Sequence, residues 1–387
     1  MKAPQPSVHP GRVDFSQSPF LVIWETTRSC GLACQHCRAS AILKRDPGEL
    51  TTAEGRDVLT QVAAMGTPIC ILSGGDPLNR IDLEELVRHG KREGLRMGTI
   101  PAATPNLTRA RIQGLKDAGL DQLAFSLDAP TALLHDQFRG VPGSFAKTME
   151  GIGFAHDVGL PLQINTCFAA WNIDSLEEMI QLVSRLGIVF WEVFFLVPMG
   201  RGQAMKGVTS EQFEMAFDRL YRLNDEASFI VKITEAPHYR RFVVQREKSL
   251  GKSSEAASAH IQHVLARPRG VQGSMGMSPQ AVNAGKGFMF IDHLGAICPS
   301  GFLPIQAGHV RTHRLAEVYR NTLLFQDLRN PALLKGRCGV CEFGSMCGGS
   351  RARAYAMTGD YLAEEPFCAY VPKSSSLVMK REEGAPC

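Results

Sequence analysis

Short apolar runs alternate with amphipathic segments from residue 20 to residue 198 of the 387-residue chain. The apolar runs are typical of buried strands, and the segments between them carry apolar residues at helical spacing. A glycine follows each amphipathic segment, where helices commonly end. The predicted strands are Phe20–Glu25, Pro68–Leu72, Arg96–Ile100, Gln122–Ser126, Leu162–Cys167 and Trp191–Val197, and the predicted helices are Thr52–Met65, Leu83–Glu93, Arg109–Ala118, Phe145–Val158 and Ser175–Leu186.

This alternation predicts an α/β fold in which six parallel βα units curl into a partial (β/α)6 TIM-like barrel. The carboxyl ends of parallel strands meet on one face, so the loops after the strands are expected to carry the active site. Thr51 or Thr52 before Glu54, and Asp174 before Glu177, are predicted to cap two of the helices.

The pattern weakens after Pro198. A helix is predicted at Glu211–Asn224, a strand at Phe229–Thr234 and a mobile excursion or lid at Lys252–Lys286. A hairpin formed by Gly287–Ile291 and Ile297–Cys298, then a helix at Leu315–Leu328, lead into a tail rich in Cys and Gly. The predicted domains are an N-terminal extension (1–19), the barrel (20–227), a connecting segment with the excursion (228–286) and a small Cys-rich domain (287–387).

Composition limits the function classes. An apolar content of 44% and a charged content of 21% are typical of a globular protein, and a net charge of +4 gives no reason to expect nucleic-acid binding. No apolar run approaches the roughly 18 residues of a membrane span. Met1–Gln17 lacks the apolar stretch of a secretory signal. Eleven cysteines without such a signal predict a reducing compartment, the cytoplasm.

Cys30, Cys34 and Cys37 form a C-x3-C-x2-C run just after the first predicted strand. They are too close together for all three to be structural disulfide partners, and no cysteine follows nearby to complete a tetrahedral zinc site. Three thiolates on a 4Fe–4S cluster leave one iron open to a ligand. A cluster site is favoured, while a partial zinc knuckle or a redox thiol pair is the alternative.

A second cysteine set lies in the tail, at Cys338, Cys341, Cys347 and Cys368. From the spacing alone, a structural zinc is at least as well supported as an iron–sulfur cluster, because C-x2-C is the commonest half of a zinc site.

The first cysteine run resembles the signature of the radical S-adenosylmethionine (SAM) superfamily. Ser73-Gly74-Gly75-Asp76-Pro77, after the second predicted strand, resembles the Gly-Gly-Glu-Pro motif of that superfamily, with Asp in place of Glu. The resemblance implies that Cys30, Cys34 and Cys37 bind a 4Fe–4S cluster. It also implies that Gly74, Gly75 and Asp76 form a turn whose backbone binds the SAM amino group.

Further motifs are similar to those of the SPASM branch of this superfamily. Ser126, in Ser126-Leu-Asp128, and Arg139, in Arg139-Gly140, match residues that contact the SAM sugar and carboxylate there. Asn165 and Leu196 are weaker candidates for SAM contacts. Pro198–Gly202 resembles a family turn near the adenine. One departure is Thr104-Pro105-Asn106, where many relatives have Thr-Asn-Gly, so the substrate side of the pocket is expected to differ.

The tail resembles SPASM/twitch domains, in which four cysteines bind an auxiliary 4Fe–4S cluster. Arg351 stands where a further family cysteine would be, and Cys298 lacks the partners of another cluster. The resemblance therefore implies one auxiliary cluster, held by Cys338, Cys341, Cys347 and Cys368. The tail is most similar to radical enzymes that modify haem precursors. Arg351 and Arg353 are expected to be surface or cluster-supporting residues, with a pairing to propionates as the alternative.

These resemblances predict a radical SAM oxidoreductase or maturase-like enzyme. It would cleave SAM reductively to a 5′-deoxyadenosyl radical, with electrons from a flavodoxin or ferredoxin, and abstract hydrogen from a substrate C–H bond. A tetrapyrrole is the favoured substrate, and a ribosomally made peptide is the alternative. A non-catalytic iron–sulfur redox sensor or a zinc-stabilised binding protein is the alternative from another class. No residue is assigned a catalytic role. Cys70 and Cys167 are predicted to be strand residues packed in the core, and His36 is predicted to cover the first cysteine site without binding it.

Overall fold

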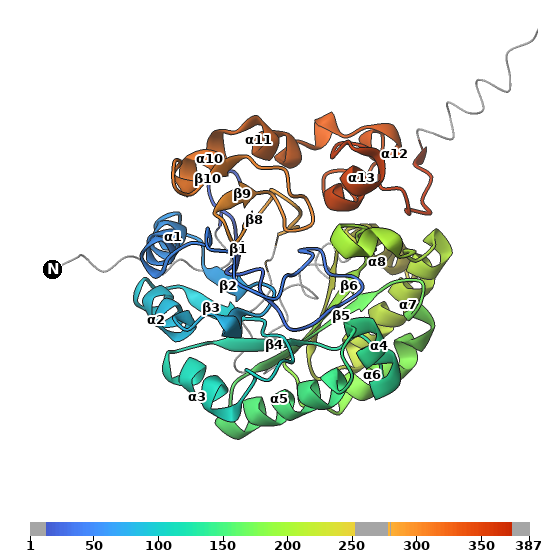
Figure 1. The fold of residues 1–387 in the computed structure, drawn as a ribbon. Helices are drawn as coiled ribbons and strands as arrows, with labels where there is room; N and C mark the ends of the chain where they lie inside the picture. Colours follow the sequence, from blue (N-terminus) through green and yellow to red (C-terminus); the bar gives the residue numbers. More distant parts are fainter. Residues whose placement is uncertain (1–12, 252–277, 279, 374–387) are drawn as a thin grey trace, which may run out of the picture.

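The computed structural model describes residues 13–251, 278 and 280–373 (Figure 1). Seven parallel strands form a curved sheet in chain order, and helices cover its outer face. The apolar predicted runs become strands because both of their faces are buried: Val22, Trp24 and Cys70, for example, are completely inaccessible to solvent. The strands are β1 (Leu21–Glu25), β2 (Ile69–Ser73), β3 (Arg96–Thr99), β4 (Gln122–Ser126), β5 (Leu162–Phe168), β6 (Phe190–Phe195) and β7 (Ile230–Thr234).

The connecting helices begin and end largely where the sequence predicts. Thr51 caps the first helix and forms a reciprocal capping box with Glu54. The glycines predicted to end helices, such as Gly66 and Gly159, have positive φ. The helices are α1 (Thr52–Ala64), α2 (Leu83–Arg92), α3 (Arg109–Asp117), α4 (Ala132–Arg139), α5 (Ser144–Val158), α6 (Leu176–Ser184), α7 (Ser210–Glu226) and α8 (Tyr239–Ser249), with 3-10 turns η2 (Pro77–Asn79), η3 (Ile173–Ser175) and η4 (Gly200–Ala204).

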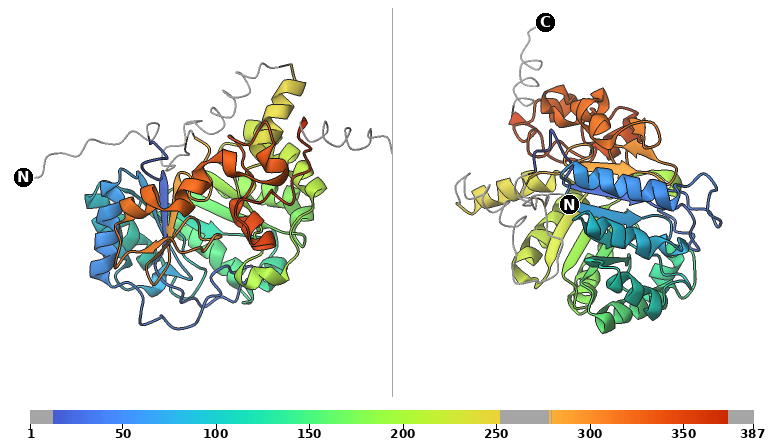
Figure 2. Two further views of the ribbon diagram at one scale, coloured as in Figure 1. Left: turned by 90° about the horizontal axis from the view of Figure 1, so that it is seen from above. Right: turned by 90° about the vertical axis from the view of Figure 1, so that its left-hand side faces the viewer.

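The C-terminal segment begins by extending the barrel sheet. β8 (Phe288–Ile291) pairs in parallel with β1, and the predicted hairpin with β9 (Ala296–Cys298) is confirmed. β10 (Gly308–His309) completes a ten-stranded sheet. The views of Figure 2 show this segment, orange to red, against one side of the barrel. The helices that follow are α10 (Leu315–Asn321), α11 (Leu323–Arg329), η5 (Pro331–Leu333), α12 (Gly336–Gly339) and α13 (Arg351–Thr358).

Some predicted elements differ from the structure. The helix predicted at Leu315–Leu328 is two helices separated by Thr322, and Asp174 lies within η3 instead of capping a helix. Helices α4 and α8 were not predicted. Most of the predicted excursion, residues 252–277 and 279, lies outside the described residues. The division into domains stays a prediction. β8 to β10, from the predicted C-terminal domain, belong to the same sheet as the barrel strands.

Within the described ranges, no helix combines the length and the apolar character needed to cross a membrane.

Candidate functional site

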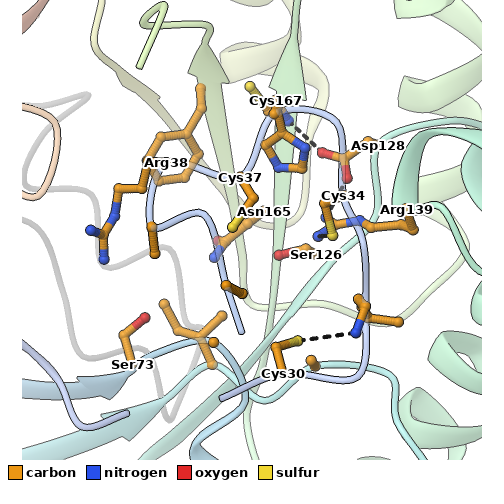
Figure 3. Close-up of a pocket in the computed structure, with 18 of the residues that line it drawn as sticks. Cys30, Cys34, Cys37, Arg38, Ser73, Ser126, Asp128, Arg139, Asn165 and Cys167 are labelled. Carbon is orange, nitrogen blue, oxygen red and sulfur yellow. Dashed lines mark hydrogen bonds and ion pairs between the residues drawn. The ribbon is translucent and has the colours of Figure 1, made fainter. Parts of the chain in front are cut away.

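A cavity of about 230 Å³ opens at the carboxyl ends of the barrel strands. The three clustered cysteines come from the loop after β1, the glycine pair follows β2, and other lining residues come from β4, β5 and the loop after β6. Figure 3 shows the three cysteine side chains directed into one space. Of the candidate cofactor residues, Cys30, Cys34, Cys37, Gly74, Gly75, Ser126, Arg139, Asn165 and Leu196 all line this cavity.

The cysteine loop is held by backbone bonds to α4. The N–H groups of Ala33 and Gln35 donate to the carbonyls of Arg139 and Phe138, at 3.1 and 2.9 Å. The Leu32 N–H donates to Cys30 Sγ at 3.3 Å. Burial raises the pKa of the Cys30 thiol to about 12. A metal bound to this sulfur would favour the thiolate despite the burial. The burial would then shield the metal-bound sulfur from water.

The Gly74-Gly75-Asp76 turn is joined to the segment that leads into the cysteine loop. Gly75 N–H donates to Thr27 O and Asp76 N–H donates to Ser29 O, each at 2.7 Å. A Cβ on Gly74 would lie 2.6 Å from Thr27 O, and one on Gly75 would lie 2.5 Å from Ser29 O. The glycines are therefore required by the close approach of two protein backbones, which positions the first cysteine.

Gly75→Ala is expected to separate these two segments, because its Cβ has only backbone atoms to displace. We expect a loss of about 1–3 kcal/mol in the free energy of unfolding, together with lower iron binding during anaerobic reconstitution. Gly153→Ala is the matched control, since a Cβ there meets no atom within 4 Å and the residue lies inside α5. Equal iron binding and equal stability of the two variants would contradict this account.

Asp76 differs from the other candidate residues, because it does not line the cavity. Its side chain is completely buried. One carboxylate oxygen accepts a hydrogen bond from Thr104 Oγ1 at 2.6 Å, and the other accepts from the N–H groups of Leu78 and Ala102. Asp76 was predicted to belong to a turn whose backbone binds SAM, and that role stays a prediction, but its side chain does not face the cavity. Asp76 instead positions the loop after β3, whose residues 100–103 line the cavity.

Arg139, the last residue of α4, is fixed beside the cysteines. Its guanidinium forms a buried ion pair with Asp128, and Nη1 lies 3.6 Å from Cys34 Sγ. Burial opposes its charge, but Asp128 and Cys34 hold the pKa of Arg139 above its ordinary value. Its Nε–H is buried without a partner. Arg139 can therefore still donate to an anionic ligand in the cavity.

His36, between two of the cysteines, lines the cavity and stacks on Phe138 with the ring centroids 4.4 Å apart. Burial lowers its pKa to about 4, so the imidazole is neutral at neutral pH. This position agrees with the prediction that His36 covers the cysteine site.

Two further arginines line the cavity. Arg201, in the Pro198–Gly202 turn, donates from its backbone to Cys37 O and from Nε to Cys34 O, at 3.1 and 2.8 Å. Arg38 pairs with the buried carboxylate of Glu25 at 2.7 Å. The motif around Arg201 was recognised in the sequence, but its contact with the cysteine loop was not.

Cys167 was predicted to pack in the core, and this is wrong, because it is only half-buried and lines the cavity. Its place on β5, two residues after Asn165, was a signal for this position, since alternate strand residues share a face. Cys70 is completely buried, as predicted. Phe302 also lines the cavity, so the C-terminal segment contributes to its wall.

The four tail cysteines line a second cavity, of about 30 Å³. Glu365 N–H donates to Cys338 Sγ at 3.3 Å, and Gly349 N–H donates to Cys347 Sγ at 3.4 Å. The cavity is also lined by His238 and Arg241 of the barrel. In the part of the chain that the structure describes, no three Cys, His, Asp or Glu side chains form a ligand set for a single metal ion.

Arg351 and Arg353 are only 2% and 1% exposed. Arg353 pairs with the equally buried Glu365 and donates to the carbonyls of Leu196 and Glu235, while Arg351 donates to Tyr361 O and Ala363 O. The expectation of surface arginines is therefore wrong. Burial also argues against the propionate alternative, because neither guanidinium lies where a substrate could reach it. Arg353 links the wall of the main cavity, at Leu196, to the second cysteine set.

Comparisons with known proteins show the family of this chain. The model of the Radical SAM superfamily matches residues 24–183. The chain is 39% identical over 360 residues to an AdoMet-dependent heme synthase of Methanosarcina barkeri, covering 93% of this chain and 99% of that protein. It is 38% identical over 372 residues to an AdoMet-dependent heme synthase of Nitratidesulfovibrio vulgaris, covering 95% and 97%.

The fold also has solved counterparts. The structure of Streptococcus suis SuiB bound to S-adenosylmethionine matches with a TM-score of 0.68 at 14% identity, covering 92% of this chain and 78% of that one. At that identity the match establishes a shared fold. The match to the family model covers the cysteine loop and most of the barrel, and the two heme synthases align along nearly the whole chain. The chain belongs to the radical SAM superfamily.

Proposed function

We propose that this protein is a radical SAM enzyme that acts on a tetrapyrrole haem precursor. The observation that carries the proposal is the single cavity in which three clustered cysteines meet Gly74, Gly75 and Arg139. Identity of 38–39% to two AdoMet-dependent heme synthases, along more than nine-tenths of the chain, supports the tetrapyrrole as the substrate class.

The donor sets fit iron–sulfur clusters. In each set the cysteines border one cavity, and backbone N–H groups are directed at Cys30, Cys338 and Cys347. N–H···S bonds of this kind are a usual means of tuning a cluster. We propose that Cys30, Cys34 and Cys37 hold a 4Fe–4S cluster with one iron open to SAM. Cys338, Cys341, Cys347 and Cys368 would hold an auxiliary 4Fe–4S cluster.

When bound and reduced, the first cluster with SAM supplies a 5′-deoxyadenosyl radical that can remove hydrogen from an unactivated C–H bond. The protein residues orient the reactants and exclude water. Arg139 would bind the SAM carboxylate through its Nε–H group, which has no partner within the protein. Ser126 and Asn165 offer polar side chains to the sugar, and Leu196 offers an apolar contact. The backbone carbonyls of Gly74 and Gly75 would accept hydrogen bonds from the SAM amino group.

The charge of the cavity supports anionic ligands. Arg38, Arg139 and Arg201 line it, whereas Asp128 is the one acidic residue that lines it in the described part of the chain. The carboxylates of SAM and of a tetrapyrrole would both be attracted there. Arg38 and Arg201 are the proposed residues for substrate carboxylates, since Arg139 is assigned to the SAM carboxylate.

The cellular setting belongs to the same proposal. All ten cysteines in the described residues are free thiols, which supports a reducing compartment, the cytoplasm. A flavodoxin or ferredoxin would supply the electron there.

The test is an anaerobic reaction of reconstituted protein with SAM, dithionite and a panel of haem-precursor tetrapyrroles carrying deuterium on their side chains. The expected result is a mass change in one tetrapyrrole with transfer of deuterium to 5′-deoxyadenosine. SAM cleavage with modification of a test peptide and of none of the tetrapyrroles would favour a peptide maturase. Failure to bind SAM after reconstitution would favour a redox sensor.

A further inference from the structure

His238 is a buried histidine that the proposed reaction does not use. It directly precedes α8 and is completely inaccessible to solvent. Both of its ring nitrogens lack a hydrogen-bond partner. A neutral imidazole carries one N–H donor and one acceptor nitrogen, and buried polar groups normally find partners. A histidine without partners at this position indicates that a partner is supplied by a bound group.

The surroundings of His238 show where that partner is. On one side the ring meets the aromatic rings of Phe213 and Phe217, with centroids 4.7 and 4.9 Å away, which leave its nitrogens unsatisfied. His238 also lines the cavity bordered by Cys338, Cys341, Cys347 and Cys368. A group bound among these cysteines could therefore supply the missing partner.

Arg241, one turn further along α8, adds a second donor. Its two terminal nitrogens bind Glu214, and one of them also binds Gln245, but its buried Nε–H has no partner. Arg241 lines the same cavity. One turn of a barrel helix thus presents two unsatisfied donors to a site whose cysteines all come from the C-terminal segment.

We propose that His238 is part of the auxiliary cluster site and donates its ring N–H to a sulfur atom of the bound cluster, with Arg241 Nε–H as a second donor. This inference rests on the proposed auxiliary cluster. The role is that of a donor because four thiolates already complete the ligand set. Hydrogen bonds to cluster sulfurs stabilise the more negative, reduced state and raise the reduction potential. The potential of this cluster would then depend on the position of α8.

The experiment uses the full chain with Cys30, Cys34 and Cys37 replaced by alanine, so that only the auxiliary cluster remains. Potentiometric titration followed by EPR is then compared for this parent and for its H238F, H238Q and H156F derivatives. H238F keeps a flat ring without a donor, and H238Q restores an amide donor. His156, on α5, is the control, because its ring forms a hydrogen bond with Leu186 O and does not line the cysteine cavity.

We expect H238F to bind as much iron as the parent, with a lower potential and an altered EPR signal, and H238Q to return toward the parent. H156F should match the parent. An unchanged potential and signal in H238F would overturn the role of His238. A parent that binds no iron would instead overturn the auxiliary cluster itself, so the two failures are distinguishable.

A second measurement does not depend on how the His238 variants fold. In the parent labelled with nitrogen-15 histidine, pulsed EPR of the reduced cluster is expected to detect weak coupling to a ring nitrogen, because His238 is the histidine among the described residues that lines this cavity. Absence of any histidine coupling would overturn the proposal. Strong coupling, typical of a nitrogen bound directly to iron, would overturn the donor role.

Discussion

Replacing Cys34 with alanine is expected to reduce 5′-deoxyadenosine formation to the level of a protein-free control. Cys34 is buried in the middle of the cysteine loop, and its Sγ lies 3.6 Å from Arg139 Nη1. Removing this thiol would leave two ligands where the cluster needs three, and Arg139 would lose a negative partner. The measurement is 5′-deoxyadenosine per chain after dithionite reduction with SAM, alongside iron and sulfide content.

Cys70→Ala is the matched control. Cys70 is also a buried thiol, but it lies in β2 within the apolar core and lines neither cysteine cavity. It should retain full 5′-deoxyadenosine formation after reconstitution. Comparable activity of Cys34→Ala and Cys70→Ala would show that the cavity cysteines do not bind the catalytic cluster.

Replacing Arg353 with methionine is expected to lower the free energy of unfolding by about 3–5 kcal/mol. Arg353 and Glu365 are each 1% exposed and are paired at 3.1 Å. Without the guanidinium, Glu365 would be a buried charge with no cationic partner, and the carbonyls of Leu196 and Glu235 would lose a donor. The effect is measured by denaturant unfolding of the apoprotein under reducing conditions.

Two further variants identify the cause. R353M/E365Q removes both charges and should be more stable than R353M alone, because the unpaired carboxylate is gone. Arg219→Met breaks a surface pair with Glu177 and should cost no more than about 1 kcal/mol. If R353M and R219M had equally small effects, the buried pair would not contribute to stability as described.

The barrel was predictable because its strands are buried on both faces and its helices are amphipathic. Each therefore leaves a clear local pattern, as at Val22 and Trp24 of β1 or at the capping box of Thr51. α4 lacks such a pattern. It has eight residues, and two adjacent leucines, Leu133 and Leu134, lie at its solvent side, exposed by 79% and 38%. α8 was missed because charged residues dominate its sequence.

Most of the candidate site could also be predicted, because its motifs stand directly after successive strands. The direction of the Asp76 side chain could not be predicted, since a carboxylate in a tight turn can face a ligand or a neighbouring loop. Only the structure shows that it accepts a hydrogen bond from Thr104, 28 residues later. The link from Arg353 to Leu196 and the approach of His238 to the tail cysteines join residues a hundred or more positions apart. No local pattern reports such contacts.

The most direct test of the central claim is anaerobic reconstitution of the full chain, followed by reduction with dithionite in the presence of SAM. The account predicts 5′-deoxyadenosine formation by protein that holds about eight irons per chain, the content of two 4Fe–4S clusters. SAM cleavage by protein with about four irons per chain would contradict the auxiliary cluster and favour a zinc site at the tail cysteines. No 5′-deoxyadenosine from fully reconstituted protein would contradict the proposed function.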